Sequence, residues 1–209
     1  VHSMIQNTCE GEIDTGWMMR NLTDLTLQQG IEIKTGCKVI HFHESSKEVQ
    51  LDIQNPIGTE IITLFASKLF VCTNAFASTL VPDLDITPGR GQVLITKPIQ
   101  HLPFKGIFHF DQGYYYFRAY RGCVLLGGGR NLAMEKETTL EIELNQAIQS
   151  DLEEKLRTLI IPDKKFDIDL RWAGIMAFGP TKQPIIQQYS NRIFIGVRMG
   201  GMGIAIGAE

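Results

Sequence analysis

The chain has 209 residues, of which 44% are hydrophobic, and this is enough apolar material to build one large or two small globular domains. Its formal net charge is −3 and its Lys and Arg residues form no runs, so we exclude nucleic acid as a partner. No apolar stretch approaches the roughly 20 residues of a transmembrane helix, and we expect no membrane-spanning segment.

The four cysteines indicate a reducing, cytoplasmic setting, because their spacing contains no CxxC motif. Cys72 lies inside an apolar run, where we expect a small, reduced hydrophobic side chain. The chain begins at Val1 without methionine and ends at Glu209 inside a helix-like pattern. We therefore expect it to be a piece of a longer protein.

The first third of the chain predicts a helix followed by short strands. Helical spacing of apolar residues predicts a helix over 15–29, with Gly30 as its stop. Alternating patterns then predict a small antiparallel meander, with strands at 31–34, 38–44 and 48–54 and a turn at 55–58 before the segment "EIITLF" at 60–65. The continuous apolar run at 69–72 is typical of a buried parallel strand, and it passes directly into a short helical pattern.

The remainder of the chain predicts an antiparallel sheet, one long helix and two further strands. Strand patterns separated by Gly and Pro signals occur at 91–98, 106–111, 113–120 and 123–129. Thr138 and Glu141 match a capping box ahead of a predicted helix over 140–160. Strands are predicted at 166–178 and 192–197.

The last predicted strand runs into the glycine cluster "RMGGMGIAIG" at 198–207. Glycines between a strand and a helix allow backbone N–H groups to approach a ligand closely, and such a turn suits a phosphate, a carboxylate or an anionic ring. The alternative is that Gly200, Gly201 and Gly203 only permit close packing of the helix against the strand. The glycine pattern alone does not decide between these two roles.

Six stretches in order resemble the FAD-dependent D-amino-acid oxidase family, which includes glycine oxidase, sarcosine oxidase and related amine dehydrogenases. The stretches are "GWMMRNLTDLTLQQGIEIKTGCKV", "LFVCTNAFASTLVPDL", "TPGRGQVL", "YYYFRAYRGCVLLGGGR", "RWAGIMAFGPTKQPII" and "RIFIGVRMGGMGIAIG". The resemblance covers nearly the whole chain. It implies an α+β fold in which part of an FAD-binding domain joins an antiparallel substrate-binding domain.

The same resemblance implies domain boundaries and one missing part. Residues 1–85 are expected to form a partial FAD-binding domain with the small meander, residues 86–170 the substrate domain, and residues 171–209 a return segment to the FAD-binding domain. The family's N-terminal GxGxxG unit, which approaches the FAD pyrophosphate, has no counterpart here. We therefore expect FAD in the full-length parent and weak or no FAD binding by this chain alone.

Cofactor-binding residues follow from the resemblance at three places. Thr73, Asn74 and Ala75 end the buried strand where the family brings backbone close to the cofactor, although an ordinary strand-to-helix turn is the alternative. Arg90 and Gly91 lie at the entry into the substrate sheet, where cofactor packing and an interdomain hinge both remain open. The third set is the glycine turn, with residues Gly200, Gly201, Met202, Gly203 and Ile204.

Substrate-binding residues are predicted on one strand and beside the glycine turn. Alternation places Tyr114, Tyr116 and Arg118 on one face, where an arginine among aromatics suits a carboxylate, unless it only stacks on surface tyrosines. Trp172 belongs either to the site or to the core. Arg198 is the stronger carboxylate candidate, with an external salt bridge as its alternative role.

Two departures bear on the substrate and on metals. Ile175 and Met176 stand where relatives often place an arginine, which puts the family's usual carboxylate contact in doubt. His41 and His43 share a face, but no third ligand lies nearby, and we expect no metal site.

The function implied by the resemblance is oxidation of the C–N bond of an amino acid or secondary amine to an imine, by hydride transfer to the flavin. No catalytic protein side chain is required, because the flavin carries the redox chemistry. Two alternatives remain open. One is a flavin dehydrogenase acting on a hydroxy acid or a glycerol phosphate, and the other is a non-catalytic binding domain that retains the flavoprotein architecture.

Overall fold

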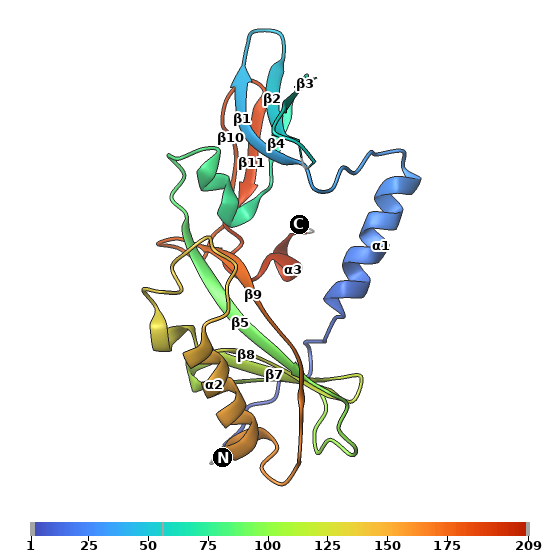
Figure 1. Ribbon diagram of the computed structural model, residues 1–209, viewed down its shortest axis with the longest axis vertical. Coiled ribbons are helices and arrows are strands. Elements are labelled where there is room, and N and C mark those ends of the chain that lie inside the picture. The colour runs from blue at the N-terminus through green and yellow to red at the C-terminus, as the bar shows by residue number, and fades with distance from the viewer. Residues whose placement is uncertain (1–2, 56, 208–209) are drawn as a thin grey trace. The chain divides into compact units, whose positions relative to one another are not determined.

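The computed structural model describes residues 3–55 and 57–207, which divide into two compact units, residues 1–35 and 36–209. The first unit contains helix α1 (Thr15–Gln28; Figure 1), as predicted. Asp14 caps it, because its side-chain oxygen accepts a hydrogen bond from the Trp17 N–H at 3.0 Å. The strand predicted at 31–34 is wrong, since this stretch has no hydrogen-bonded strand partner among the described residues.

The second unit begins with an antiparallel three-stranded sheet, which confirms the predicted meander for its segments at 38–44, 48–54 and 60–65. Its strands in order are β1 (Lys38–Glu44), β2 (Val49–Gln54) and β3 (Ile61–Ala66). Arg192, close to the C-terminal end of the chain, forms hydrogen bonds with residues at the edge of this sheet. Its backbone N–H donates to Glu44 at 2.8 Å, and its guanidinium donates to the backbone carbonyls of Ser46 and Ser67.

A second sheet brings together strands that are far apart in the sequence. Its order is β10 (Ile185–Gln188), β11 (Ile193–Val197) and β4 (Leu69–Val71). Strands β11 and β4 run parallel, so the predicted parallel strand is confirmed. One face of the sheet is buried, while Cys72, just beyond β4, is a free cysteine with an exposed side chain.

The third sheet has five antiparallel strands, and this confirms the sheet predicted from the Gly-punctuated segment. The order is β6 (Ile107–Phe110), β7 (Tyr115–Tyr120), β8 (Cys123–Gly128), β5 (Thr87–Thr96) and β9 (Ile168–Phe178). The strand predicted at 166–178 is thus β9, which runs alongside β5 (Figure 1). We call these five strands the large sheet.

Helix α2 (Gln146–Lys155) packs on one face of the large sheet and continues as a wider turn, η4 (Leu156–Ile160; Figure 1). Its apolar side chains recur every four residues, which is the spacing that places them on one helix face. Ile148, Leu152 and Leu156 are completely buried against Leu94 and Leu126 of the sheet. This packing is the core of the large sheet and its helix.

The start of α2 differs from the prediction. The predicted helix begins at 140, but the observed cap is Asn145, whose side-chain oxygen accepts from the N–H groups of Ala147 and Ile148. Residues 140–144 are non-helical because polar side chains of β5 bind the backbone carbonyls of Glu141 and Glu143. A tertiary interaction therefore overrides the local capping-box signal.

Candidate functional site

The turns that follow β4 and β11 meet at one edge of their sheet. Because the two strands are parallel neighbours, their carboxyl ends lie side by side, which is where open sheets of this kind commonly bind ligands. The Asn74 side-chain oxygen accepts a hydrogen bond from the Met199 N–H at 3.2 Å. The structure thus brings the predicted turn at 73–75 together with the predicted glycine turn.

The backbone of these turns adopts left-handed conformations at four positions. Asn74 has φ 49° and Arg198 has φ 63°, while Gly200 and Gly201 have φ 59° and 81°. Such conformations cost little for Gly and are tolerated by Asn, but they are strained for Arg. Strained backbone of this kind clusters at functional sites, where the surrounding structure holds it in place.

Three backbone N–H groups of the glycine turn have no acceptor in the described part of the chain. Gly200 donates to the Ala177 carbonyl at 3.0 Å, and Met202 donates to the Met199 carbonyl at 2.9 Å. The N–H groups of Gly201, Gly203 and Ile204, at the start of α3 (Gly203–Ile206), make no such bond. Neighbouring free N–H groups form an anion- or carbonyl-binding concavity.

The face of the large sheet opposite α2 has an open floor beside this turn. Gly91 on β5 pairs with Gly174 on β9, and a Cβ at Gly174 would meet no atom within 4 Å. A Cβ at Gly91 would lie 3.1 Å from the Met176 methyl carbon, and a Cβ at Gly201 would lie 3.4 Å from the Met176 sulfur. The Met176 side chain therefore connects the floor to the glycine turn.

Aromatic side chains border the same face. The Tyr116 ring covers Gly127 so closely that a Cβ there would lie 2.5 Å from the ring. Val93 pairs with both Gly127 and Trp172, so Tyr116 and Trp172 stand in one row across the sheet. Trp172 is 40% exposed, which excludes its alternative role as a core residue. Burial raises the pKa of the Tyr116 hydroxyl.

Arg118 shares the face of Tyr116, whereas Tyr114 does not belong to the strand. The Arg118 guanidinium lies over the Tyr120 ring, 5.2 Å from its centroid. Tyr114 precedes β7 and has helix-like backbone angles, which break the alternation. The predicted row of three residues is therefore reduced to Tyr116 and Arg118.

Arg90 forms a buried ion pair, a role that the sequence did not indicate. Its Nε and Nη2 donate to the two carboxylate oxygens of Glu137 at 3.0 and 2.9 Å. The Glu137 carboxylate also accepts from the side chains of Gln92 and Asn145. Burial alone would raise the pKa of Glu137, but these hydrogen bonds hold it below its ordinary value. The Arg90 side chain thus binds the loop before α2, on the face away from the open floor.

Arg198 directs its guanidinium to protein atoms. Nε donates to the Gln183 carbonyl at 3.1 Å, and Nη1 donates to the Asp85 carbonyl at 3.0 Å and lies 3.6 Å from the Asp85 carboxylate. Its side chain is only 11% exposed and covers Gly179. These hydrogen bonds give the Arg198 guanidinium a structural role. The carboxylate-binding role predicted for Arg198 stays a prediction.

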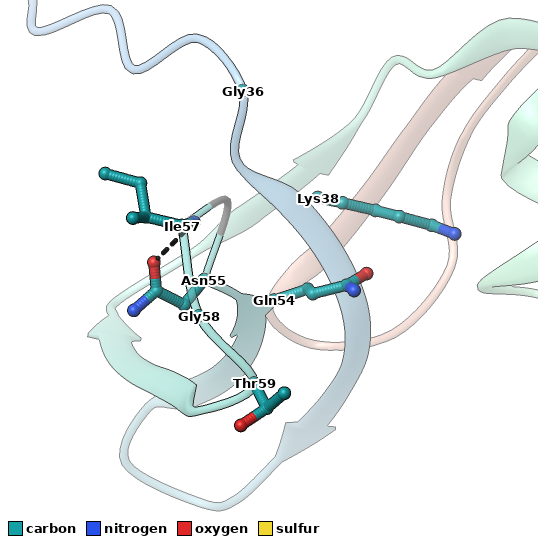
Figure 2. A pocket seen from close by; sticks show the side chains of 7 residues that line it. All are labelled: Gly36, Lys38, Gln54, Asn55, Ile57, Gly58 and Thr59. Carbon is teal, nitrogen blue, oxygen red and sulfur yellow. Dashed lines mark hydrogen bonds between the residues drawn. The ribbon is translucent and has the colours of Figure 1, made fainter.

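A separate pocket of about 560 Å³ lies where the hairpin β2–β3 turns beside β1 (Figure 2). It contains none of the predicted site residues and is lined by Gly36, Lys38, Gln54, Asn55, Ile57, Gly58 and Thr59. Lys38 and Gln54 are cross-strand partners that extend to the same side, away from Asn55 and Ile57 (Figure 2). One ammonium group without further converging charges gives this pocket no evident chemistry.

Neither a metal centre nor a membrane helix is found in the described ranges. Within residues 3–55 and 57–207, no three His, Cys, Asp or Glu side chains are grouped so that they could hold a metal ion. His41 instead faces Asp52, with 3.7 Å between its Nδ1 and the carboxylate. Among the described helices, none combines the length and the apolar character needed to cross a membrane.

The sequence analysis missed Gly174 and the structural role of Glu137. Gly174 is part of the candidate site only because it pairs with Gly91 on the neighbouring strand. The pairing of two strands so far apart in the sequence cannot be predicted from local residue patterns. Met176 was noted only as the replacement of an arginine, although its side chain joins the floor to the glycine turn.

Known structures share this fold over most of the chain. An L-proline dehydrogenase from P. horikoshii matches with a TM-score of 0.69 and 18% identity, over 89% of this chain and 50% of that one. A glycine oxidase from Geobacillus kaustophilus matches with a TM-score of 0.70 and 15% identity, over 87% and 48%. An iminodiacetate oxidase from Chelativorans sp. BNC1 matches with a TM-score of 0.71 and 15% identity, over 91% and 50%.

These similarities cover only part of each relative, since the chain spans about half the length of the solved structures it matches. No curated protein sequence matches it significantly. The profile of one family, described as FAD dependent oxidoreductase, matches residues 3–208. With the α+β fold that it shares with flavoenzyme structures, the chain belongs to this family of FAD-dependent oxidoreductases, the DAO family.

Proposed function

We propose that the protein containing this chain oxidises the C–N bond of an amino acid or secondary amine to an imine, with FAD as the hydride acceptor. One observation supports this proposal above the others. The Met176 side chain lies against both the floor of the large sheet and the glycine turn, whose N–H groups are free. A flavin at the turn and a small substrate on the floor would then be direct neighbours.

The residues present fit the flavin ring of FAD. The free N–H groups of Gly201, Gly203 and Ile204 suit the carbonyl oxygens and the ring nitrogen that becomes anionic on reduction. Gly200 and Gly201 carry no side chain that would obstruct a planar ring. Asn74, fixed by its bond to Met199, places the turn at 73–75 beside the same position. When bound, FAD supplies the redox chemistry by accepting a hydride.

The chain's own residues would position the substrate and exclude water. The open space above Gly174 leaves room for a small amine beside the Met176 methyl group, which covers Gly91, while Tyr116 and Trp172 form apolar walls with polar tips. The neutral amine would lose a hydride from its carbon while its nitrogen lone pair forms the C=N double bond, and the resulting protonated imine would release a proton to water to give the imine. Water then hydrolyses the imine to a carbonyl compound and ammonia or an amine, so no protein nucleophile is needed.

Several solved relatives support the amine class over the alternative substrates. The printed names of the structural relatives cited above concern proline, glycine and iminodiacetate, each of which carries an amine nitrogen and a carboxylate. A glycerol-3-phosphate dehydrogenase complexed with FAD has a lower TM-score of 0.60. We therefore rank a hydroxy acid or glycerol phosphate below an amine as the proposed substrate. Because the chain lacks a GxGxxG unit, weak FAD binding by these 209 residues alone stays a prediction.

The experiment is an anaerobic substrate screen with the whole flavoprotein. The visible absorbance of its flavin is followed after mixing with an α-amino acid, an N-methyl amino acid, the matching hydroxy acid or glycerol phosphate. We expect rapid bleaching by one or both amines and none by the other two compounds. Bleaching by the hydroxy acid or glycerol phosphate alone would contradict the proposal, and so would a purified protein that takes up no FAD.

A further inference from the structure

Arg130 lies on an aromatic ring next to the open floor. It is the first residue of η3 (Arg130–Ala133), directly after β8. Its guanidinium carbon is 4.6 Å from the centroid of the Phe178 ring. A Cβ at Gly89 would lie 2.8 Å from that carbon and 2.4 Å from the Phe178 ring, so only glycine at this position leaves room for the stacked pair.

The Arg130 guanidinium makes no hydrogen bond and no ion pair with a described residue, its Nε is buried, and the Glu137 carboxylate acts on it only through longer-range electrostatic attraction. Several other arginines of the large sheet and its surroundings have such partners, as Arg90 has in Glu137, Arg171 in Glu153 and Arg198 in two backbone carbonyls. The neighbouring Asn131 side-chain oxygen is also buried without a partner. Buried polar groups in folded proteins are nearly always paired, so these two point to a partner outside the described residues.

The position of Arg130 relates directly to the proposed substrate site. Gly89 and Gly91 alternate along β5 and therefore face the same side of the sheet, about 7 Å apart along the strand. Gly89 pairs with Met176, the residue that touches the glycine turn. Arg130 thus borders the floor on the side where the proposed flavin position lies.

We propose that Arg130 binds the carboxylate of the substrate. This inference rests on the proposed function and names the charged group by which that function recognises its amino acid. Contact with the Phe178 ring restrains the guanidinium, and its two Nη groups, which bond to no described residue, could form a forked, two-point contact with a carboxylate. Ile175 and Met176 supply no such group on β9 itself. Arg198, the candidate from the sequence, is committed to the carbonyls of Asp85 and Gln183.

The experiment measures carboxylate binding to the whole flavoprotein. Propionate and its uncharged amide, propionamide, are titrated separately, and binding is read from the change in the flavin visible spectrum. In Arg130→Met we expect the Kd of propionate to rise at least about 30-fold, and in Arg130→Lys by a smaller factor, because lysine keeps the charge and loses the fork. The Kd of propionamide is expected to change less than about threefold in either variant.

Arg157→Met is the matched control, because Arg157 also lies over a phenyl ring, that of Phe166 at 5.9 Å, but is 64% exposed at the end of α2. Its propionate affinity should equal that of the wild type. The inference is overturned if propionate binds wild type and both Arg130 variants equally, or if wild type does not bind propionate more tightly than propionamide. If Arg130→Met loads no FAD, the decision rests on Arg130→Lys.

The two proposals fail in distinguishable ways. Bleaching of the flavin by amines is measured on wild type alone, separately from the carboxylate affinities of the variants. If an amine bleaches the wild-type flavin but the variants bind propionate as tightly as wild type, the proposed function is supported and the role of Arg130 is refuted. Wild type that no amine bleaches removes the proposed function, whatever the variants bind.

Discussion

Replacing Glu137 by alanine is expected to lower the free energy of unfolding by about 3 to 5 kcal/mol, the cost of leaving the partner of a buried ion pair uncompensated. Glu137 is completely buried, and its carboxylate accepts from Arg90, Gln92 and Asn145. Without it, the Arg90 guanidinium stays in the interior with backbone carbonyls as its remaining acceptors. Urea unfolding of the whole protein, followed by tryptophan fluorescence, measures the loss.

A double variant separates the ion pair from the packing around it. In Arg90→Met/Glu137→Leu both charges are absent, and we expect a smaller loss than in Glu137→Ala, because no unpaired charge remains. Exposed Glu154, which makes no ion pair with a described residue, provides the control Glu154→Ala, with an expected change below about 0.5 kcal/mol. Equal losses in the single and double variants would show that the charge is not the cause.

The same carboxylate predicts how stability depends on pH. Its pKa in the folded protein is held below the ordinary value, so the folded state favours the ionised form. The stabilisation is fully present above the unfolded-state pKa of about 4.3 and is lost as the pH falls through the folded-state pKa. Wild type should therefore lose stability below about pH 4.3, and Glu137→Gln should lack this part of the decrease.

The second large effect is expected at Arg198. Arg198→Ala removes the hydrogen bonds that the guanidinium donates to the carbonyls of Asp85 and Gln183, and it uncovers Gly179. We expect a loss of about 2 to 3 kcal/mol in the free energy of unfolding, since hydrogen bonds from charged groups are the stronger ones. Arg198→Lys should recover only part of this loss, because a single ammonium cannot reproduce both contacts.

Kinetics decide whether Arg198 also binds substrate. The sequence-based role as carboxylate anchor predicts that Arg198→Ala abolishes the preference of kcat/KM for an amino acid over its decarboxylated amine. The contacts within the protein predict lower stability with that preference retained. Arg118→Ala is assayed in parallel, because Arg118 was the second carboxylate candidate. An unchanged unfolding free energy in Arg198→Ala would contradict the structural role.

Local patterns in the sequence predicted most strands and helices but not their partners. Alternation and turn residues located β5 to β9, and the short apolar run at 69–72 was correctly assigned as a parallel strand. The helix start at 140 failed because Arg90 and Gln92, about 50 positions away, bind the carbonyls of Glu141 and Glu143. A strand signal at 31–34 failed because alternation alone does not supply a neighbouring strand.

The site was predictable to the same extent. Glycines mark the turn at 198–207 by themselves, because few other residues allow its left-handed backbone. Its surroundings depend on register and on tertiary contacts, which one sequence does not encode locally. The pairing of Gly91 with Gly174 and the stacking of Arg130 on Phe178 are of this kind. The sequence therefore located both turns of the candidate site, but it gave no signal for Gly174 or Arg130.

The central claim is that the turns after β4 and β11 together hold the flavin, and amide hydrogen exchange of the whole protein with and without FAD tests it most directly. Exchange is measured at single residues by mass spectrometry with fragmentation. FAD should slow exchange at Gly201, Gly203 and Ile204, while Gly200, already bonded to Ala177, changes little. In Asn74→Ala, which loses the bond between the turns, this protection should require more FAD. Saturating FAD that leaves exchange at 198–207 unchanged, while protecting other segments, would contradict the account.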